Sequence, residues 1–240
     1  MIERKEEAMM VRNYNDFCRE LLKAGFSMAG GNSEGIFALV NFGWNDEPDD
    51  SPIRWHTDDP ETDPWEWRMR VLEQRNDIAY AKVFFRKGGY ITKEWYPYFL
   101  AVRRGGRDFE EEYREGLISY EAKRIYQVVS EVEDMSLDEI KRVAGFGKED
   151  KSKFDRGLVE LQMKMYLTMC GRRQRLSAHG IGHGWNSTVF CTTERFFGES
   201  VFEEAKKMSK QDGIEAIREQ VLWLNPEATE RKMKKFIEGM

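Results

Sequence analysis

One stretch of the sequence combines tryptophans with a guanidinium group in a pattern that could hold a flat ring. Trp55-His56 is followed by Asp63-Pro64-Trp65-Glu66-Trp67-Arg68. Indole faces and guanidinium planes stack on nucleobases and cover planar ligands. On a helix, however, positions i and i+2 point in different directions, so these side chains cannot all share one face. Two interpretations follow. One is a base or ligand pocket; the other, which we favour, is packing of the tryptophans as helix anchors. The pocket would be formed by Trp55, His56, Trp65, Trp67 and Arg68.

A second set of residues is suited to phosphate. Residues 141–175 carry ten basic side chains against four acidic ones. Lysine and arginine neutralise phosphate oxygens, and a serine hydroxyl adds positioning contacts without reading sequence. A solvated face paired with acidic residues and a protein-contact surface are the alternatives. The predicted DNA-binding residues are Ser152, Lys153, Arg156, Arg172, Arg173 and Arg175, with His179 and His183 beside them in a hairpin tip.

The elements that position these basic residues follow a recognisable order. Apolar periodicity predicts helices over 119–132, 137–144 and 151–165, and Ser136 and Glu139 have capping-box spacing at the start of the second. Two strands over 166–170 and 188–193 follow, separated by a polar stretch. Three helices and a hairpin are typical of a winged helix-turn-helix, whose third helix meets DNA.

The remaining segments complete an α+β fold that is mainly helical. A long surface loop is expected over 45–64, a helix capped by Asp63 up to Gln74, a buried strand over 78–85, and helices over 199–210, 213–224 and 227–238. The glycine-punctuated linker 103–107 suggests a domain boundary. The predicted domains are an N-terminal α/β domain (1–107), for which a winged-helix-like fold is one option, a winged helix (108–197) and C-terminal helices (198–240).

Composition excludes several classes of protein. The chain has 240 residues, of which 40% are hydrophobic, so it can bury a core. No apolar run is long enough to span a membrane, and the charged N-terminus does not resemble a secretory signal. The three cysteines are far apart and predict reduced thiols in a cytoplasmic protein. Neither a metal nor a cofactor is expected, and the oligomeric state is left open. Nine acidic residues against one arginine over 44–66 contrast with the basic segment.

Two stretches of the sequence resemble a known family. Phe84–Ile91 followed by Trp95–Tyr98 resembles an aromatic, small-residue and proline motif of the AlkZ-type winged-helix DNA glycosylases, and Trp185–Arg195 resembles the end of that family's second winged helix. The likeness covers residues 78–197 and is greatest to the shorter AlkZ-related proteins of bacteria. It implies winged helices around a DNA-binding channel and, in family members with the catalytic motif, hydrolysis of the N-glycosidic bond of alkylated bases.

The catalytic part of the family pattern is absent. The family signature is Gln-x-Gln or Gln-x-Asp in the first domain, whereas no glutamine precedes Gln74 here, and Gln162-Met163-Lys164 does not match. No family catalytic residue can therefore be carried over. A relocated site would need a carboxylate to orient water, for which Asp63 and Glu66 are the weak candidates. Asp63 has a simpler interpretation as a helix cap.

Three hypotheses remain. The first is a non-catalytic protein that binds double-stranded DNA, in DNA repair or damage recognition. The second is a DNA glycosylase with its active site at Asp63 and Glu66. The third is a winged-helix transcriptional regulator. The missing Gln-x-Gln favours the first and third hypotheses over the second.

Overall fold

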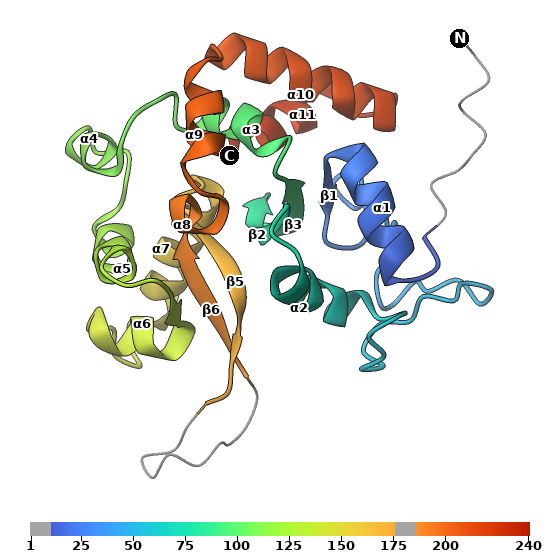
Figure 1. Ribbon diagram of the computed structural model, residues 1–240, viewed down its shortest axis with the longest axis horizontal. Helices are drawn as coiled ribbons and strands as arrows, with labels where there is room; N and C mark the ends of the chain where they lie inside the picture. Colours follow the sequence, from blue (N-terminus) through green and yellow to red (C-terminus); the bar gives the residue numbers. More distant parts are fainter. Residues whose placement is uncertain (1–10, 176–185) are drawn as a thin grey trace.

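A six-stranded antiparallel sheet lies at the centre of the computed structural model, which describes residues 11–175 and 186–240 (Figure 1). Its strand order is β1-β3-β2-β5-β6-β4. The halves of the sheet join where Tyr80 of β2 pairs with Met169 of β5. The strands are β1 (Phe26–Met28), β2 (Ile78–Phe84), β3 (Lys87–Thr92), β4 (Met135–Ser136), β5 (Leu167–Arg173) and β6 (Ser187–Thr192).

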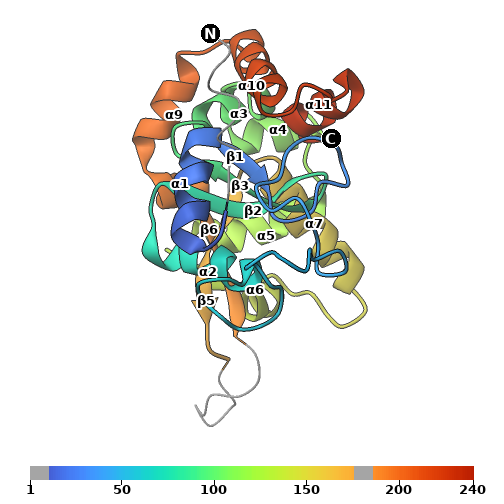
Figure 2. The ribbon, with the colours of Figure 1, turned by 90° about the vertical axis from the view of Figure 1, so that its right-hand side faces the viewer.

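Helices pack on both sides of this sheet. In both ribbon views, α10 and α11 lie at the end of the molecule opposite the outer ends of β5 and β6 (Figures 1 and 2). The helices are α1 (Tyr14–Ala24), α2 (Pro64–Gln74), α3 (Tyr96–Arg103), α4 (Phe109–Arg114), α5 (Tyr120–Ser130), α6 (Leu137–Val143), α7 (Lys151–Met163), α8 (Thr193–Phe197), α9 (Glu199–Lys206), α10 (Lys210–Leu224) and α11 (Glu230–Glu238).

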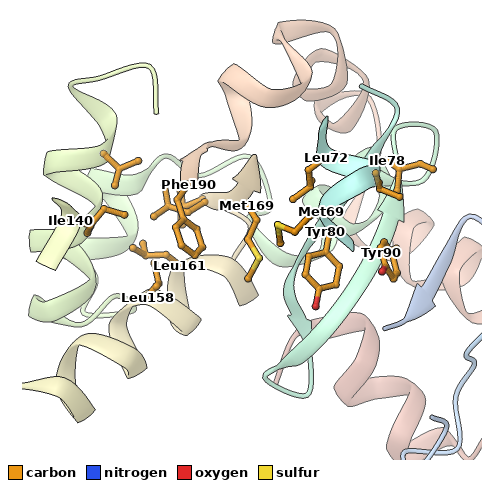
Figure 3. Packing of buried hydrophobic residues seen from close by; sticks show 14 of the residues in the cluster. Met69, Leu72, Ile78, Tyr80, Tyr90, Ile140, Leu158, Leu161, Met169 and Phe190 are labelled. Carbon is orange, nitrogen blue, oxygen red and sulfur yellow. The ribbon is translucent and has the colours of Figure 1, made fainter. Parts of the chain in front are cut away.

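In the described part of the chain, the buried residues form two clusters, and each contains residues from distant parts of the sequence. One joins α1, α2, β2 and β3 to α5, α6, α7, β5 and β6. Figure 3 shows this cluster running from Ile140 and Leu158 through Met169 to Tyr80 and Tyr90. The other cluster joins β1, β2 and β3 to α3, α8, α9, α10 and α11. The sheet and both cores therefore continue across the linker 103–107.

Most predicted elements are present with small changes at their ends. Asp63 caps α2, and Ser136 and Glu139 form the predicted capping box of α6. The last helix begins later than predicted, because its N-cap is Thr229. Asn225, which precedes the predicted start, accepts the backbone N–H of Glu227 and donates its side-chain amide to the carbonyl oxygens of Gly35 and Ile36. The mixed α/β character of the fold is thus confirmed.

The segment between β1 and α2 has neither helix nor strand, as the sequence predicted for 45–64. It is not wholly a surface loop, however, because Ile36, Val40 and Ile53 are buried. Its end is held by Asp63, whose carboxylate accepts hydrogen bonds from the backbone N–H groups of Thr57 and Asp58. These contacts fix the loop against the start of α2.

Candidate functional site

A groove of about 920 Å³ runs along the exposed side of α7. Its other walls come from the start of α5, the β2–β3 turn and the two residues after α11. The groove is mixed in charge, with acidic side chains of α7 and its surroundings among the basic ones. The basic lining residues are Arg86, Lys151, Lys153, Arg156 and Lys164, and the acidic ones are Glu121, Glu149, Asp155 and Glu160.

Three of the predicted DNA-binding residues lie together in this groove. Ser152, Lys153 and Arg156 are exposed on the first two turns of α7. Lys153 forms an ion pair with Asp150, with Nζ and Oδ1 3.3 Å apart. Arg156 forms no ion pair with any carboxylate in the described ranges, so its guanidinium is available to an anion. The helix N-terminus adds partial positive charge beside these side chains.

Polar contacts with neighbouring elements fix the position of α7. Glu160 accepts hydrogen bonds from the backbone N–H and the hydroxyl of Ser119, at 2.9 and 2.6 Å, and so ties α7 to the start of α5. Gln162 is buried and accepts a hydrogen bond from the backbone N–H of Lys82 in β2. Two of the polar residues near the groove therefore have structural roles.

The predicted arginines of the hairpin are held by carboxylates. Arg172 pairs with Glu66 and Glu73 of α2, at 3.1 and 2.8 Å. Arg173 pairs with Asp134 and Glu139, and a hydrogen bond with Asp134 raises its pKa. Arg175 pairs with Asp138 of α6 at 2.6 Å. These three arginines carry less unpaired positive charge than the sequence suggests.

The structure does not bring the two predicted basic groups into one groove. Arg173 and Arg175 line a separate groove of about 510 Å³ beside α6, together with Arg142, Asp138 and Glu139. His179 and His183 lie outside the described residues. The α7 groove and the α6 groove are thus two distinct surfaces.

The aromatic residues of the N-terminal half form a small pocket. Its volume is about 250 Å³, and it lies between β1 and β3, the loop that follows β1, and the first turns of α2. Trp55, Trp65 and Arg68 line it, as one interpretation of the sequence predicted. The other lining residues are Met28, Ala29, Gly30, Gly43, Trp44, Pro64, Tyr80, Lys87, Gly88 and Tyr90.

The rings around this pocket contact one another. The His56 ring lies between those of Trp44 and Trp65, at centroid distances of 6.2 and 5.1 Å. The Arg68 guanidinium carbon lies 3.4 Å from the centroid of the Trp65 ring. Tyr80 and Tyr90 form the floor with centroids 4.8 Å apart, and burial raises the pKa of both hydroxyls. Both phenols are therefore neutral and can donate hydrogen bonds at physiological pH.

Trp67, the fifth residue of the predicted pocket, faces the core instead. It is fully buried and packs on Phe17 of α1, with ring centroids 5.0 Å apart. Each of the two interpretations of this motif therefore holds for a different tryptophan. Trp65 lines a pocket and Trp67 anchors the helix, as expected for side chains two positions apart on a helix.

The two candidate catalytic carboxylates are occupied by structural contacts. Asp63 is fully buried, and it caps α2 by accepting the backbone N–H of Trp65 at 2.8 Å. Glu66 is paired with Arg172. Neither residue lines the aromatic pocket. Within the described ranges, no three His, Cys, Asp or Glu side chains are grouped so that they could hold a metal ion.

Sequence reasoning missed several residues that line these two sites. Trp44 is one of them, and it has no other aromatic residue beside it in the acidic segment. Tyr80 and Tyr90 are others; they lie opposite each other on β2 and β3, a pairing that the sequence does not reveal. Arg86 and Lys87 follow one another in the chain, yet Arg86 lines the α7 groove and Lys87 the aromatic pocket. Arg86 lies in the turn between β2 and β3 with a left-handed backbone (φ 61°), so strand alternation does not predict this division.

Comparison with protein families gives a match over nearly the whole described chain. The model of a family described as AlkZ related matches residues 11–238. The chain belongs to the AlkZ-related family. Searches of the curated proteins and of the solved structures gave no match. In this AlkZ-related protein, no helix of the described residues is long and apolar enough to cross a membrane. The resemblance identified from residues 78–197 is thereby confirmed and extends over a longer range.

Proposed function

We propose that this AlkZ-related protein binds double-stranded DNA through the exposed side of α7. The observation that carries the proposal is the α7 groove itself. Lys151, Lys153 and Arg156 project from α7 into it, and Arg86 faces them from the β2–β3 turn. Lys164, at the C-terminal end of α7, also lines the groove and is paired with Glu112. An α-helix with basic side chains at its N-terminal turns suits a DNA groove flanked by phosphates.

The order of elements around α7 supports a winged helix. Helices α5, α6 and α7 are followed by the β5–β6 hairpin, and the short strand β4 pairs with β6. In such a domain the third helix reads DNA and the hairpin is the wing. The ion pairs of Arg172, Arg173 and Arg175 make α7, rather than the described part of the wing, the main source of phosphate contacts in this proposal.

The proposal is limited to binding, in a DNA repair or damage-recognition role suggested by the family. A glycosylase would need a carboxylate able to reach the substrate. Asp63 is buried as a helix cap, and Glu66 is engaged with Arg172. A transcriptional regulator is distinguished by a preferred sequence, and binding should therefore be compared on several unrelated duplexes.

Duplex binding across a salt series tests the proposal. The double variant Lys153→Ala/Arg156→Ala should weaken binding and reduce the slope of log K against log salt by about one to two, because each lost phosphate contact is worth about 0.9. The matched control is Lys206→Ala/Lys207→Ala at the C-terminal end of α9, which removes two positive charges from an exposed surface outside the groove. Equal effects of the two double variants, or no binding at low salt, would refute the proposal.

A further inference from the structure

The lining of the aromatic pocket has a charge opposite to that of its neighbourhood. The surrounding segment 44–66 is strongly acidic, yet among the described residues no aspartate or glutamate lines the pocket. Its two charged residues are both cations, Arg68 and Lys87. Five of the eleven other lining residues are aromatic: Trp44, Trp55, Trp65, Tyr80 and Tyr90. A flat ring attached to an anionic group complements this combination of surfaces.

We propose that the pocket binds one nucleotide, with the base against the tryptophan rings and the phosphate beside Lys87 and Arg68. Stacking on aromatic rings accepts any base, since every base has a π face. The volume of about 250 Å³ suits one base and not an oligonucleotide. A cationic ligand is disfavoured, because Arg68 and Lys87 repel it.

Both cations have hydrogen-bonding capacity left for a phosphate. Lys87 donates to Glu34 and Ser33, at 2.6 and 3.3 Å, and an ammonium group has three donors. Arg68 donates Nε–H to the carbonyl oxygen of Trp65, and no carboxylate in the described residues forms an ion pair with it. Arg68 also hydrogen-bonds to the Tyr80 hydroxyl. Because a guanidinium has five N–H donors, some remain for a phosphate, and stacking on Trp65 orients them.

A donor on the pocket wall also lacks an acceptor. Trp55 has a buried indole Nε1 without a hydrogen-bond partner in the described part of the chain. Leaving a buried donor unpaired is unfavourable, and such groups normally find an acceptor in the protein, in water or in a ligand. Nucleobases carry ring nitrogens and carbonyl oxygens that can accept this hydrogen bond.

Contacts within the protein hold the walls of the pocket in place without a ligand. A Cβ atom at Gly30 would lie 2.3 Å from the Trp55 ring, so the chain approaches this ring as closely as glycine allows. Glu47 accepts the backbone N–H of Trp55 at 2.6 Å. His56 has a left-handed backbone (φ 60°), which costs free energy and is retained where surrounding contacts enforce it. Preorganisation of this kind reduces the entropic cost of binding.

The pocket and the α7 groove share the β2–β3 hairpin, through Lys87 and Arg86 respectively. The nucleotide therefore has two sources: a free mononucleotide, or a base unstacked from DNA held at α7. The second source rests on the proposed function, whereas the first does not. Duplex binding and nucleotide binding are for this reason measured separately on the same variants.

Calorimetric titration of the full chain with dAMP and with deoxyadenosine tests the site. Binding is also measured for two duplexes, one fully paired and one identical except for a single unpaired adenine. We expect Trp65→Ala to weaken dAMP binding at least about fivefold, the lower end for loss of one base–aromatic stack. Trp223→Ala on α10, also an exposed tryptophan, is the matched control and should leave it unchanged. Lys87→Gln should weaken dAMP more than deoxyadenosine.

Comparing the two duplexes shows whether the bound nucleotide is free or belongs to DNA. If Trp65→Ala removes a preference for the unpaired adenine, the nucleotide comes from DNA; if dAMP binds and the two duplexes bind equally, it is free. The proposal is overturned if Trp65→Ala and Trp223→Ala behave alike towards both dAMP and the unpaired adenine. Lys153→Ala/Arg156→Ala should weaken the fully paired duplex without changing dAMP affinity, so failure of duplex binding is recognised independently. Thermal unfolding of each variant checks that it folds.

Discussion

Arg172 of β5 and Glu73 of α2 form an ion pair, with Nε and Oε1 2.8 Å apart. Glu66, two turns earlier in α2, completes the contact at 3.1 Å. The acidic and basic segments of the sequence thus meet in part through paired side chains. Arg172, which the sequence predicts to bind DNA, is therefore paired with carboxylates of the protein. We accordingly expect most phosphate contacts to come from α7.

Replacing Arg172 by Gln should have little effect on either stability or duplex binding. The pair is partly exposed, and such pairs contribute about 0.2–1 kcal/mol to the free energy of unfolding. Its charge is already balanced by two carboxylates, so the salt slope of duplex binding should change less than in Arg156→Gln. Urea unfolding and a salt series measure the two effects. An equal loss of slope in both variants would mean that Arg172 leaves its glutamates to contact phosphate.

Arg103 is predicted to be the most sensitive arginine for stability. It is buried, and its guanidinium donates to the carbonyl oxygens of Val83, Met163, Phe236 and Ile237, which belong to β2, α7 and α11. Burial lowers its pKa to about 9, so it remains charged at neutral pH. Arg103→Met removes all four donors, and each buried acceptor left unpaired costs about 1–3 kcal/mol.

Urea unfolding should therefore show that Arg103→Met lowers the free energy of unfolding by at least about 3 kcal/mol, within the range expected for breaking a buried network. Arg231→Met, at an exposed position of α11, is the control and should change it by less than about 0.5 kcal/mol. Similar stabilities of the two variants would show that the four carbonyl groups find other donors.

The sequence predicts local structure well where caps and periodicity agree. Asp63 with Pro64 starts α2 as expected, and Ser136 with Glu139 caps α6. Local signals suffice at these positions because the cap contacts lie within four residues. The basic face at Ser152, Lys153 and Arg156 follows from the same helical periodicity, and these residues do share one groove.

Contacts between distant residues could not be predicted in this way. The pairing of Arg172 with α2 spans about a hundred positions, and Tyr80 reaches β5 through a single pair with Met169. A linker rich in glycine and arginine suggested separate domains, yet Arg103 at its start joins elements from three parts of the chain. Composition alone does not show whether a basic residue faces solvent or a carbonyl oxygen.

Gly30→Ala should disturb the aromatic pocket through sterics alone. The new Cβ would lie 2.3 Å from Cη2 of Trp55, which must move. We expect a loss of about 1–3 kcal/mol in the free energy of unfolding, as for overpacked sites, and weaker dAMP binding. Gly43→Ala is the matched control, because it lines the same pocket but its Cβ would meet no atom within 4 Å. Equal behaviour of both variants would show that Trp55 can move without cost.

Glu34 should make folding sensitive to acid. Hydrogen bonds from Lys232 and Lys87 lower its pKa below the usual value, tying the loop after β1 to α11 and β3. Since the pKa is lower in the folded state, this stabilisation is present above the unfolded pKa of about 4.3 and is lost as pH falls through the folded value. The difference in free energy of unfolding between wild type and Glu34→Gln should therefore shrink between pH 6 and about pH 3. Urea unfolding at several pH values measures it, with Glu121→Gln, a residue outside this cluster, as the control. A difference that stays constant with pH would show that Glu34 gains nothing from its two lysines.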